Sequence, residues 1–344
     1  NNNNNNNNNQ NNNSNNNNNQ NTTPAHTHSF TQKSTDSKYL KSAATCTEAA
    51  VYYYSCECGE KDTSKIFTSG SALGHDWDKG TVIKEATLTD KGLITYKCIR
   101  SGCNETKTEE IPCILASSKA GDIIKFGKYE QDGNTSNGKE DIEWLVLSNE
   151  DGRVLVISKY ALDAKVYNTE YVSVTWENCT LRSWLNNEFL NSAFDDKEKK
   201  IIPSVTLENK DNPINGRSGG NNTTDKVFCL SLDEIEKYFG EYNWYNENTM
   251  HGLNQKLICA PTQYAINNGV EFHDITDSEY NKIIKYNYSN DAIGSRGCWW
   301  WVRTPAYDSY RTCIVSPVGD SGADSSYAVN YSVSAVRPAI YLSY

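Results

Sequence analysis

The pattern of apolar and polar positions predicts a series of short strands in the second part of the chain. Apolar residues form short or alternating runs at Asp122–Phe126, Ile142–Leu147 and Val154–Ile157, a pattern that favours strands. Asp151 and Gly152 separate the last two runs, and this dipeptide is typical of a two-residue turn. We therefore expect a β-hairpin here.

Helical patterns follow these strands. Leucine and aromatic residues recur at helical spacing between Leu181 and Phe194, which predicts an amphipathic helix. Asp195 with Glu198, and later Ser231 with Glu234, stand at the spacing of a capping box, so each pair predicts the start of a short helix. Strand-like runs return near the C-terminus. Strands and helices do not alternate, and this order predicts an α+β fold.

Three adjacent tryptophans lie in the first of these late strands. Because side chains alternate along a strand, we expect Trp299 and Trp301 to share one face and Trp300 to point the other way. One of these faces should enter the core. Arg303 and Arg337 follow in the late strands, and we expect both to be scaffold residues that donate to carbonyls or carboxylates.

Composition divides the 344 residues into three parts. Residues 1–25 contain an Asn- and Gln-rich tract without apolar side chains up to Asn21, which predicts a disordered linker. Residues 26–116 are rich in cysteine, and residues 117–344 carry the predicted strands and helices. We expect the last part to form one domain.

The cysteine-rich part contains two related repeats. Ala44-Thr45-Cys46-Thr47 matches Ala86-Thr87-Leu88-Thr89, and each repeat opens with a histidine two residues before an aromatic side chain. A unit of about 40 residues seldom folds on a hydrophobic core alone. We therefore expect a metal or disulfides to stabilise these repeats.

Zinc is one candidate for this role. Cys46, Cys56, Cys58 and His75 could supply four tetrahedral ligands, the number that a structural zinc site needs. Disulfides and unpaired cysteines stay open as alternatives, because Cys56 and Cys58 have C-x-C rather than C-x-x-C spacing. The second repeat is also degenerate, since Leu88 stands where the first has Cys46. No catalytic role is expected for these cysteines.

Charge and hydropathy exclude two classes of protein. The chain has 33 basic and 43 acidic residues and a net charge of −10, which argues against a nucleic-acid partner. No run approaches the roughly 18 consecutive apolar residues of a transmembrane helix. We expect neither a nucleic-acid ligand nor a membrane-spanning segment.

Two serine motifs are the candidates for catalysis. Residues 216–220 fit G-x-S-x-G, but polar residues flank them, whereas a nucleophile elbow needs a strand before and a helix after. Residues 319–322 resemble the serine segment of chymotrypsin-like proteases, but His251 and His273 both lie in polar segments. Surface turns explain both strings better. We expect a protein that is not an enzyme.

The C-terminal stretch has the composition of a binding surface. No Lys, Glu or Gln occurs between residues 298 and 344, and half of residues 306–335 are Tyr, Ser, Asp or Asn. Tyrosine offers large, rigid contact area, and the smaller polar residues offer adaptable hydrogen bonds, as in antibody loops. A ligand-binding surface is therefore predicted here.

The same stretch resembles a known family. WWWVRTP and VRPAI are similar to the WWLRSP…GVRPA ending of an uncharacterised bacterial domain family, and the strings ISKYALDAKVYN, WENCTLRSWLNNEFLNSAF, DKVFCLSLDEIEKYF and APTQYA agree with it. The resemblance covers about Gly121–Leu342. The family looks related to the C-type-lectin-like fold of formylglycine-generating enzymes and of the variable proteins of diversity-generating retroelements. The cysteine-rich strings ATCTEAAVYYYSCECGE, LGHDW and TYKCIRSGCNETKTEEIP resemble spacer repeats of bacterial surface proteins.

The resemblance implies a bacterial surface or secreted protein that displays a C-type-lectin-like binding domain. A protein or glycan would be the ligand, and a retroelement could diversify the contact residues. By their position in the family these are Tyr307, Asp308, Ser309, Tyr310, Arg311, Asp324, Ser326, Tyr327, Asn330 and Tyr331. The calcium-dependent sugar motifs of true lectins are absent from the sequence. An enzyme of the formylglycine-generating type, which modifies sulfatases, is the alternative.

Overall fold

A computed structural model describes residues 27–240, 255–274, 296–317, 319 and 321–344, without the side chains of residues 255 and 321–325. The Asn-rich tract predicted to be a disordered linker lies outside these residues. The chain forms two compact units: residues 1–81 with 94–109, and residues 82–93 with 110–344. We call them the repeat unit and the large unit.

The first repeat is a small antiparallel sheet with little core. It has the strand order β1-β2-β3, and a 3₁₀ turn, η1 (Ser37–Tyr39), precedes it. The strands are β1 (Leu40–Ser42), β2 (Ala50–Ser55) and β3 (Lys61–Ser69). The rings of Tyr54 and Phe67 lie 5.2 Å apart on it, yet between residues 27 and 69 only Tyr39, Ser55 and Cys56 are buried.

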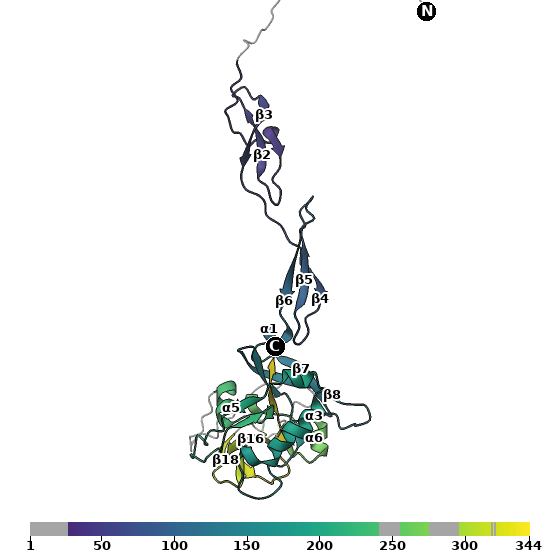
Figure 1. Ribbon diagram of the computed structural model, residues 1–344, viewed down its shortest axis with the longest axis vertical. Coiled ribbons are helices and arrows are strands. Elements are labelled where there is room, and N and C mark those ends of the chain that lie inside the picture. Colours follow the sequence, from purple (N-terminus) through teal and green to yellow (C-terminus); the bar gives the residue numbers. More distant parts are fainter. Residues whose placement is uncertain (1–26, 241–254, 275–295, 318, 320) are drawn as a thin grey trace, which may run out of the picture. The chain divides into compact units, whose positions relative to one another are not determined.

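The second repeat has the same strand order as the first. Its three-stranded sheet has the order β4-β5-β6 (Figure 1). The strands are β4 (Thr81–Lys84), β5 (Gly92–Lys97) and β6 (Thr106–Ile111). Aliphatic side chains stay in solvent on both repeats, among them Ile66, Leu73, Ile83 and Ile99. Burial of apolar surface therefore contributes little to their stability.

The large unit is built on a five-stranded antiparallel sheet with the order β13-β20-β9-β8-β7. A short helix, α1 (Ile114–Ser117), precedes it. The strands are β7 (Ile123–Tyr129), β8 (Glu140–Glu150), β9 (Arg153–Ser158), β13 (Val227–Phe228) and β20 (Ala339–Ser343). The predicted hairpin is confirmed, because Asp151 and Gly152 join β8 to β9 with positive φ angles of 53° and 72°. Positive φ at both central residues is what a type I′ turn requires.

A second five-stranded sheet has the order β10-β19-β16-β17-β18. Its strands are β10 (Asp163–Ala164), β16 (Trp300–Pro305), β17 (Arg311–Val315), β18 (Ser321–Ala328) and β19 (Ala335–Val336). Every residue of β16 is buried, so the sheet is covered on both faces at this strand.

The prediction that only one face of the tryptophan strand enters the core is wrong. Trp300 and Trp301 are both 0% exposed, because both faces of β16 are covered, and Trp299 lies before the strand and is half-buried. The indole nitrogens of the two buried rings donate to the carbonyls of Leu257 (3.1 Å) and Lys165 (2.7 Å).

Short helices and two small sheets complete the large unit. The helices are α2 (Thr180–Trp184), α3 (Leu190–Ala193), α4 (Glu198–Ile201), α5 (Leu232–Phe239) and α6 (Gln263–Asn267). The 3₁₀ turns are η2 (Trp176–Asn178) and η4 (Gln255–Leu257). The two-stranded sheets pair β11 (Val205–Leu207) with β12 (Thr223–Asp225), and β14 (Phe272–Asp274) with β15 (Arg296–Cys298).

Both predicted capping boxes form. The amphipathic helix predicted between Leu181 and Phe194, however, is not continuous. The amides of Asp195 and Glu198 each donate to the other's carboxylate at 2.8 Å, and the reciprocal pair at Ser231 and Glu234 opens α5. A π-helical turn, η3 (Leu185–Phe189), interrupts the predicted helix between α2 and α3. Strand and helix account for 36% and 16% of the structure, which supports a mixed, strand-rich fold.

Two arginines tie the sheets to their surroundings, as predicted. Arg303 is 4% exposed and donates to the carbonyl of Cys229 at 2.9 Å and to the carboxylate of Glu234. Arg337 is 3% exposed and donates to the carbonyl of Ser158 at 3.0 Å. Among the described residues, no helix is both long and apolar enough to span a bilayer.

Candidate binding surface and metal-ligand groups

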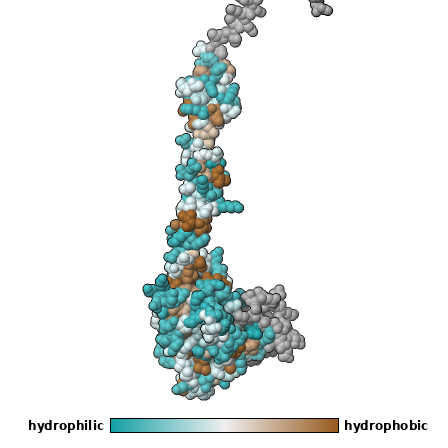
Figure 2. Space-filling view, turned by 90° about the vertical axis from the view of Figure 1, so that its right-hand side faces the viewer, coloured by the Kyte–Doolittle hydropathy of each residue, from teal (hydrophilic) through white to brown (hydrophobic). Residues whose placement is uncertain are grey.

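Three segments that are distant in the sequence enclose a hollow in the large unit. They are residues 171–175, residues 216–218 and residues 305–310, and we call the space between them the three-loop hollow. Residues from all three segments line its volume of about 350 Å³. On the face shown in Figure 2 the large unit is mainly hydrophilic, with small separate apolar patches.

Backbone and side-chain hydrogen bonds hold these segments together. The amide of Val174 donates to the carbonyl of Ser309 at 3.0 Å. The side-chain amide of Asn212 donates to the carbonyl of Pro305 at 2.7 Å, and Asn212 is 1% exposed. These two hydrogen bonds fix the segments that surround the hollow relative to one another.

Exposed tyrosines stand beside the hollow. Tyr171, Tyr307 and Tyr310 are 55%, 53% and 42% exposed, and the rings of Tyr171 and Tyr310 lie 5.2 Å apart. The guanidinium of Arg311 lies 5.5 Å from the ring centre of Tyr307. The carboxylate of Asp308 accepts from the amide of Tyr310 at 2.8 Å, which fixes the loop that carries these rings.

A second tyrosine pair follows β18. The rings of Tyr327 and Tyr331 are 4.2 Å apart, and Tyr331 is exposed whereas Tyr327 packs partly against the core beside Trp299. Burial, with smaller effects of Tyr331 and Glu271, raises the pKa of Tyr327 to about 12. Tyr327 therefore acts mainly as a packing residue beneath the exposed Tyr331.

The structure brings most predicted contact residues to the surface, but not all. Tyr307, Tyr310, Asn330 and Tyr331 are exposed, whereas Asp308, Ser309, Arg311 and Tyr327 are half-buried. Ser326 is only 8% exposed, because its side chain faces inward from β18, and the side chain of Asp324 lies outside the described residues.

Sequence reasoning missed two parts of this surface. Tyr171 and Arg217 lie far from the Tyr- and Ser-rich stretch in the sequence, so composition alone pointed away from them. The first three residues of the G-x-S-x-G string, residues 216–218, form one wall of the hollow. The guanidinium of Arg217 forms no ion pair with any residue that the structure describes.

Four residues of the repeat unit form a group that could hold a metal ion. The ligand atoms of Cys46, His75, Cys98 and Cys103 all lie within 4.8 Å of one another. Burial raises the pKa of the Cys98 thiol, but backbone hydrogen bonds from Arg100 and Asp76, with His75 and Cys103, outweigh it and lower that pKa to about 6. The neighbouring Cys46 thiol is shifted the other way, since burial and its hydrogen bonds with Cys103 and Cys98 raise its pKa to about 11.

A second group joins His28, Cys56 and Cys58. The Nδ1 atom of His28 lies 3.4 Å from the Cys56 sulfur and 3.2 Å from that of Cys58, and the two sulfurs are bonded to each other as a disulfide. The four ligands predicted from the sequence are therefore divided: Cys46 and His75 belong to one group, Cys56 and Cys58 to the other. Pairing across the repeats, which sequence spacing did not reveal, causes the difference.

Comparison with known proteins identifies the large unit. Residues 151–344 match the model of a family described as a domain of unknown function, DUF6273. The chain belongs to the DUF6273 family. No curated protein and no solved structure matches the chain. The three-loop hollow and both tyrosine pairs lie inside the DUF6273 region.

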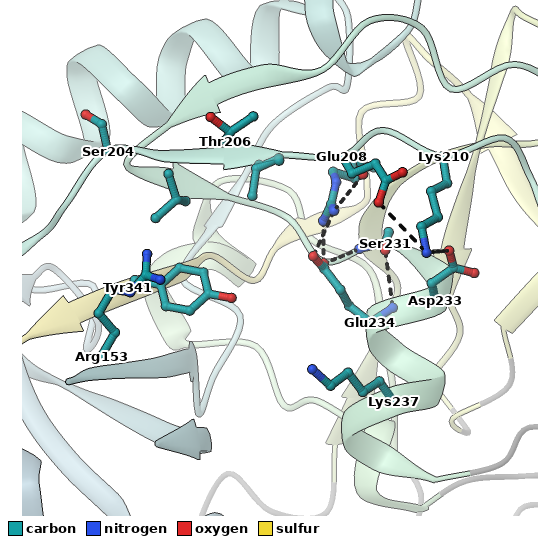
Figure 3. A pocket seen from close by; sticks show the side chains of 13 residues that line it. Arg153, Ser204, Thr206, Glu208, Lys210, Ser231, Asp233, Glu234, Lys237 and Tyr341 are labelled. Atoms are coloured by element: carbon teal, nitrogen blue, oxygen red, sulfur yellow. Dashed lines mark hydrogen bonds and ion pairs between the residues drawn. The ribbon is translucent and has the colours of Figure 1, made fainter. Parts of the chain in front are cut away.

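The DUF6273 region also has a larger pocket, of about 500 Å³, whose charged groups are mostly paired. Figure 3 shows Glu208, Lys210 and Asp233 gathered on one side of this pocket and Arg153 with Tyr341 on the other. The Lys210 ammonium lies 3.6 Å from Asp233, and Arg303 forms an ion pair with Glu234. The other two cations of the pocket, Arg153 and Lys237, form no ion pair with a described residue, so this pocket could also receive an anionic group.

The cysteines of the DUF6273 region are buried. Cys179, Cys229, Cys259, Cys298 and Cys313 are at most 3% exposed, and none of them forms a disulfide. Burial raises the pKa of both the Cys179 and the Cys313 thiols to about 12. Thiols in this state are inert toward metals and substrates.

An acidic group lies just before the DUF6273 match. Glu130, Asp132 and Glu140 bring their carboxylates within 4.8 Å of one another. Glu130 is 7% exposed, and its Oε1 atom has no hydrogen-bond partner among the described residues. Burial, followed by Asp132 and Glu140, raises the pKa of Glu130.

Proposed function

We propose that the DUF6273 region is the ligand-binding domain of a bacterial surface or secreted protein, and that the tyrosines beside the three-loop hollow contact the ligand. One observation carries the proposal: Tyr171, Tyr307 and Tyr310 stay exposed within two residues of Ser173 and Ser309, which line a hollow, in a unit whose tryptophans Trp144, Trp176, Trp300 and Trp301 are all 0% exposed. Large aromatics in water around a concavity are typical of binding sites.

The chemistry of the rim favours a protein or glycan ligand. Tyrosine rings present apolar faces and a hydroxyl that can donate or accept. Ser173, Ser218 and Ser309 also line the hollow, and they add short hydrogen-bonding groups. Arg217 adds a positive charge that no described acidic residue neutralises. Tyrosine, tryptophan and arginine are enriched among the residues that contribute most to binding.

The scaffold and its diversification belong to the same proposal. A C-type-lectin-like arrangement with a fixed core and changing loops would suit the contrast between β16, buried throughout, and the exposed loop from Tyr307 to Tyr310. Diversification by a retroelement would then change the loop tyrosines and leave Trp300, Trp301 and Arg303 unchanged.

The repeat unit would carry this domain as a spacer. We also propose that the metal of the repeat unit is zinc, because thiolate and imidazole ligands favour it. The zinc would have a structural and not a catalytic role. Location at the cell surface or in the medium is part of this proposal and rests on the resemblance of the repeats.

The alternative is an enzyme of the formylglycine-generating type. Such an enzyme would need a reactive cysteine pair, and the nearest candidates, Cys259 and Cys298, are 1% and 0% exposed. Oxidation of a sulfatase peptide that is lost in a Cys259→Ser or Cys298→Ser variant would establish the alternative.

The test measures binding of the full chain to arrays of glycans and of bacterial surface proteins. Tyr171→Ala and Tyr310→Ala should each lower affinity for any ligand found by about tenfold or more, since hot-spot truncations cost about 2 kcal/mol or more. Tyr344→Ala is the matched control, because Tyr344 is also exposed (46%) but belongs to the end of β20. Equal losses in all three variants, or none in the first two, would contradict the proposed surface.

A further inference from the structure

The four-residue group of the repeat unit has the dimensions of an occupied tetrahedral site. The sulfurs of Cys46 and Cys98 are 3.7 Å apart, and the Cys103 sulfur is 3.4 Å from the Nδ1 atom of His75. With Zn–S bonds of about 2.3 Å and Zn–N bonds of about 2.0 Å, tetrahedral angles place two sulfurs about 3.8 Å apart and a sulfur and a nitrogen about 3.5 Å apart. Both separations agree with the structure.

Two different repeats supply these ligands. Cys46 belongs to the first repeat and stands between β1 and β2, whereas Cys98 and Cys103 follow β5 of the second. His75 opens the second repeat. The metal would therefore connect consecutive repeats, which strand pairing within each small sheet does not do.

Backbone hydrogen bonds hold the segments that carry these ligands close together. The amide of Gly74 donates to the carbonyl of Cys46 at 3.1 Å, which holds the residue next to His75 against the first repeat. The amide of Ile99 donates to the carbonyl of Asp76 at 2.8 Å, which brings the end of β5 to the same place. The ring of Trp77 stacks on His75 with centres 4.8 Å apart, so the imidazole has a fixed orientation.

The repeat unit needs such a link. Ile66, Leu73 and Ile99 are 46%, 52% and 63% exposed, so the apolar residues around the group do not form a core. Small domains that lack a core are usually stabilised by a metal or by disulfides. Among Cys46, Cys98 and Cys103 no disulfide is formed.

We propose that Cys46, His75, Cys98 and Cys103 bind one structural Zn²⁺, and that Cys46, donated by the preceding repeat, is the ligand that joins the two repeats. The inference rests on the proposed zinc only for the choice of ion, and it is independent of the tyrosine surface. It adds to that proposal the ligands and the mechanical role of the metal.

The group at His28 is the counterpart of this site in the first repeat. His28, Cys56 and Cys58 occupy in the first repeat the places of His75, Cys98 and Cys103, and His28 stacks on Phe30 as His75 does on Trp77. Among the described residues this group has three ligands, and Cys56 and Cys58 are joined as a disulfide, so we expect it to bind zinc more weakly than the four-ligand group.

The position of Leu88, at the end of the second repeat that leads into the large unit, agrees with this arrangement. Leu88 stands where the first repeat has Cys46, and it packs against the core of the large unit instead of facing a third repeat. A cysteine at this place would have no histidine and cysteine pair to complete. The missing fourth cysteine, which made the second repeat look degenerate, is therefore the expected end of the series.

The experiment measures the zinc content of the full chain, purified under reducing conditions, by elemental analysis. We expect one equivalent of zinc per chain, and loss of that equivalent in Cys46→Ser. Cys58→Ser is the matched control: it removes a cysteine of the equivalent group in the first repeat and should keep the equivalent. Co²⁺ added in place of zinc should give the absorption bands of a tetrahedral thiolate site in the control variant and not in Cys46→Ser.

Each other outcome overturns the proposal. Full zinc content in Cys46→Ser would show that the preceding repeat does not supply a ligand. Loss of zinc in Cys58→Ser but not in Cys46→Ser would place the ion at the His28 group. A metal-free protein with a Cys46–Cys98 disulfide in its peptide map would replace the metal with a covalent link. Circular dichroism of Cys46→Ser separates loss of metal from loss of fold, since the large unit should keep its signal.

Discussion

Arg303 donates to both carboxylate oxygens of Glu234, and the same carboxylate closes the capping box of α5. One oxygen of Glu234 accepts from the Arg303 guanidinium at 2.8 Å, and the other accepts from the backbone amide of Ser231 at 2.9 Å. A single side chain therefore fixes both the start of a helix and a buried charge on β16.

This relationship predicts that Arg303→Ala is strongly destabilising. Loss of one partner of a buried ion pair costs about 3–5 kcal/mol, and the lower end of this range applies here because the Glu234 side chain left behind is 24% exposed. The free energy of unfolding in urea measures the loss. Lys91→Ala, which breaks the exposed pair of Lys91 with Glu110, should leave stability unchanged, because exposed pairs contribute little. Equal effects of the two substitutions would refute the assigned role of Arg303.

The buried tryptophans should differ from their neighbour. Trp300→Ala and Trp301→Ala should each cost about 3–5 kcal/mol, as for other large aromatics removed from a core. Trp299→Ala should cost less, because Trp299 is only half-buried. Thermal unfolding of the three variants tests the order, which would be reversed if Trp299 rather than Trp300 were the core residue.

Glu130 should make stability fall as the pH rises. Its pKa in the folded state is raised above the ordinary value of 4.5, first by burial. Below the ordinary pKa both folded and unfolded states are protonated. Above it the unfolded chain releases the proton first, so the folded state loses stability until the pH passes the raised pKa.

The variant Glu130→Gln should remove this dependence. Its melting temperature should exceed that of the native chain at neutral pH, and the two should converge near pH 4. Glu188→Gln, at an exposed position of η3, is the control and should follow the native chain. A native chain that gains stability between pH 4 and 7 relative to Glu130→Gln would contradict the assignment.

Gly219 should be necessary for the shape of the three-loop hollow. A Cβ atom at this residue would lie 2.2 Å from the carbonyl oxygen of Lys210 and 2.3 Å from that of Asn209, so the backbone must shift. Overpacking of this kind costs about 1–3 kcal/mol. Gly219→Ala should lower both the melting temperature and ligand affinity, whereas Gly138→Ala, a loop glycine with open space around it, should leave affinity unchanged.

Local signals were the part of the fold that sequence reasoning could predict. Asp151-Gly152 and the two capping boxes depend on neighbouring residues alone, and all three formed as expected. The burial of the tryptophan strand was harder to predict. Both faces of β16 are covered by segments that lie far away in the sequence, such as that of Lys165.

The candidate sites show the same limit. Tyr307 and Tyr310 were found through composition, but Tyr171 joins them only through folding of the large unit. The structure groups Cys46 of the first repeat with His75, Cys98 and Cys103 of the second. Spacing within one repeat could not reveal that the two cysteines of the second repeat complete this group.

The order β13-β20-β9-β8-β7 has a practical consequence for producing the DUF6273 region. The family match begins at Asp151, inside the β-hairpin, and so omits β7 and β8. A fragment cut there would leave the inner strand β9 as a bare edge with unpaired amides and carbonyls, which invites pairing between molecules and aggregation. A soluble fragment should begin at or before Glu110, where the large unit resumes.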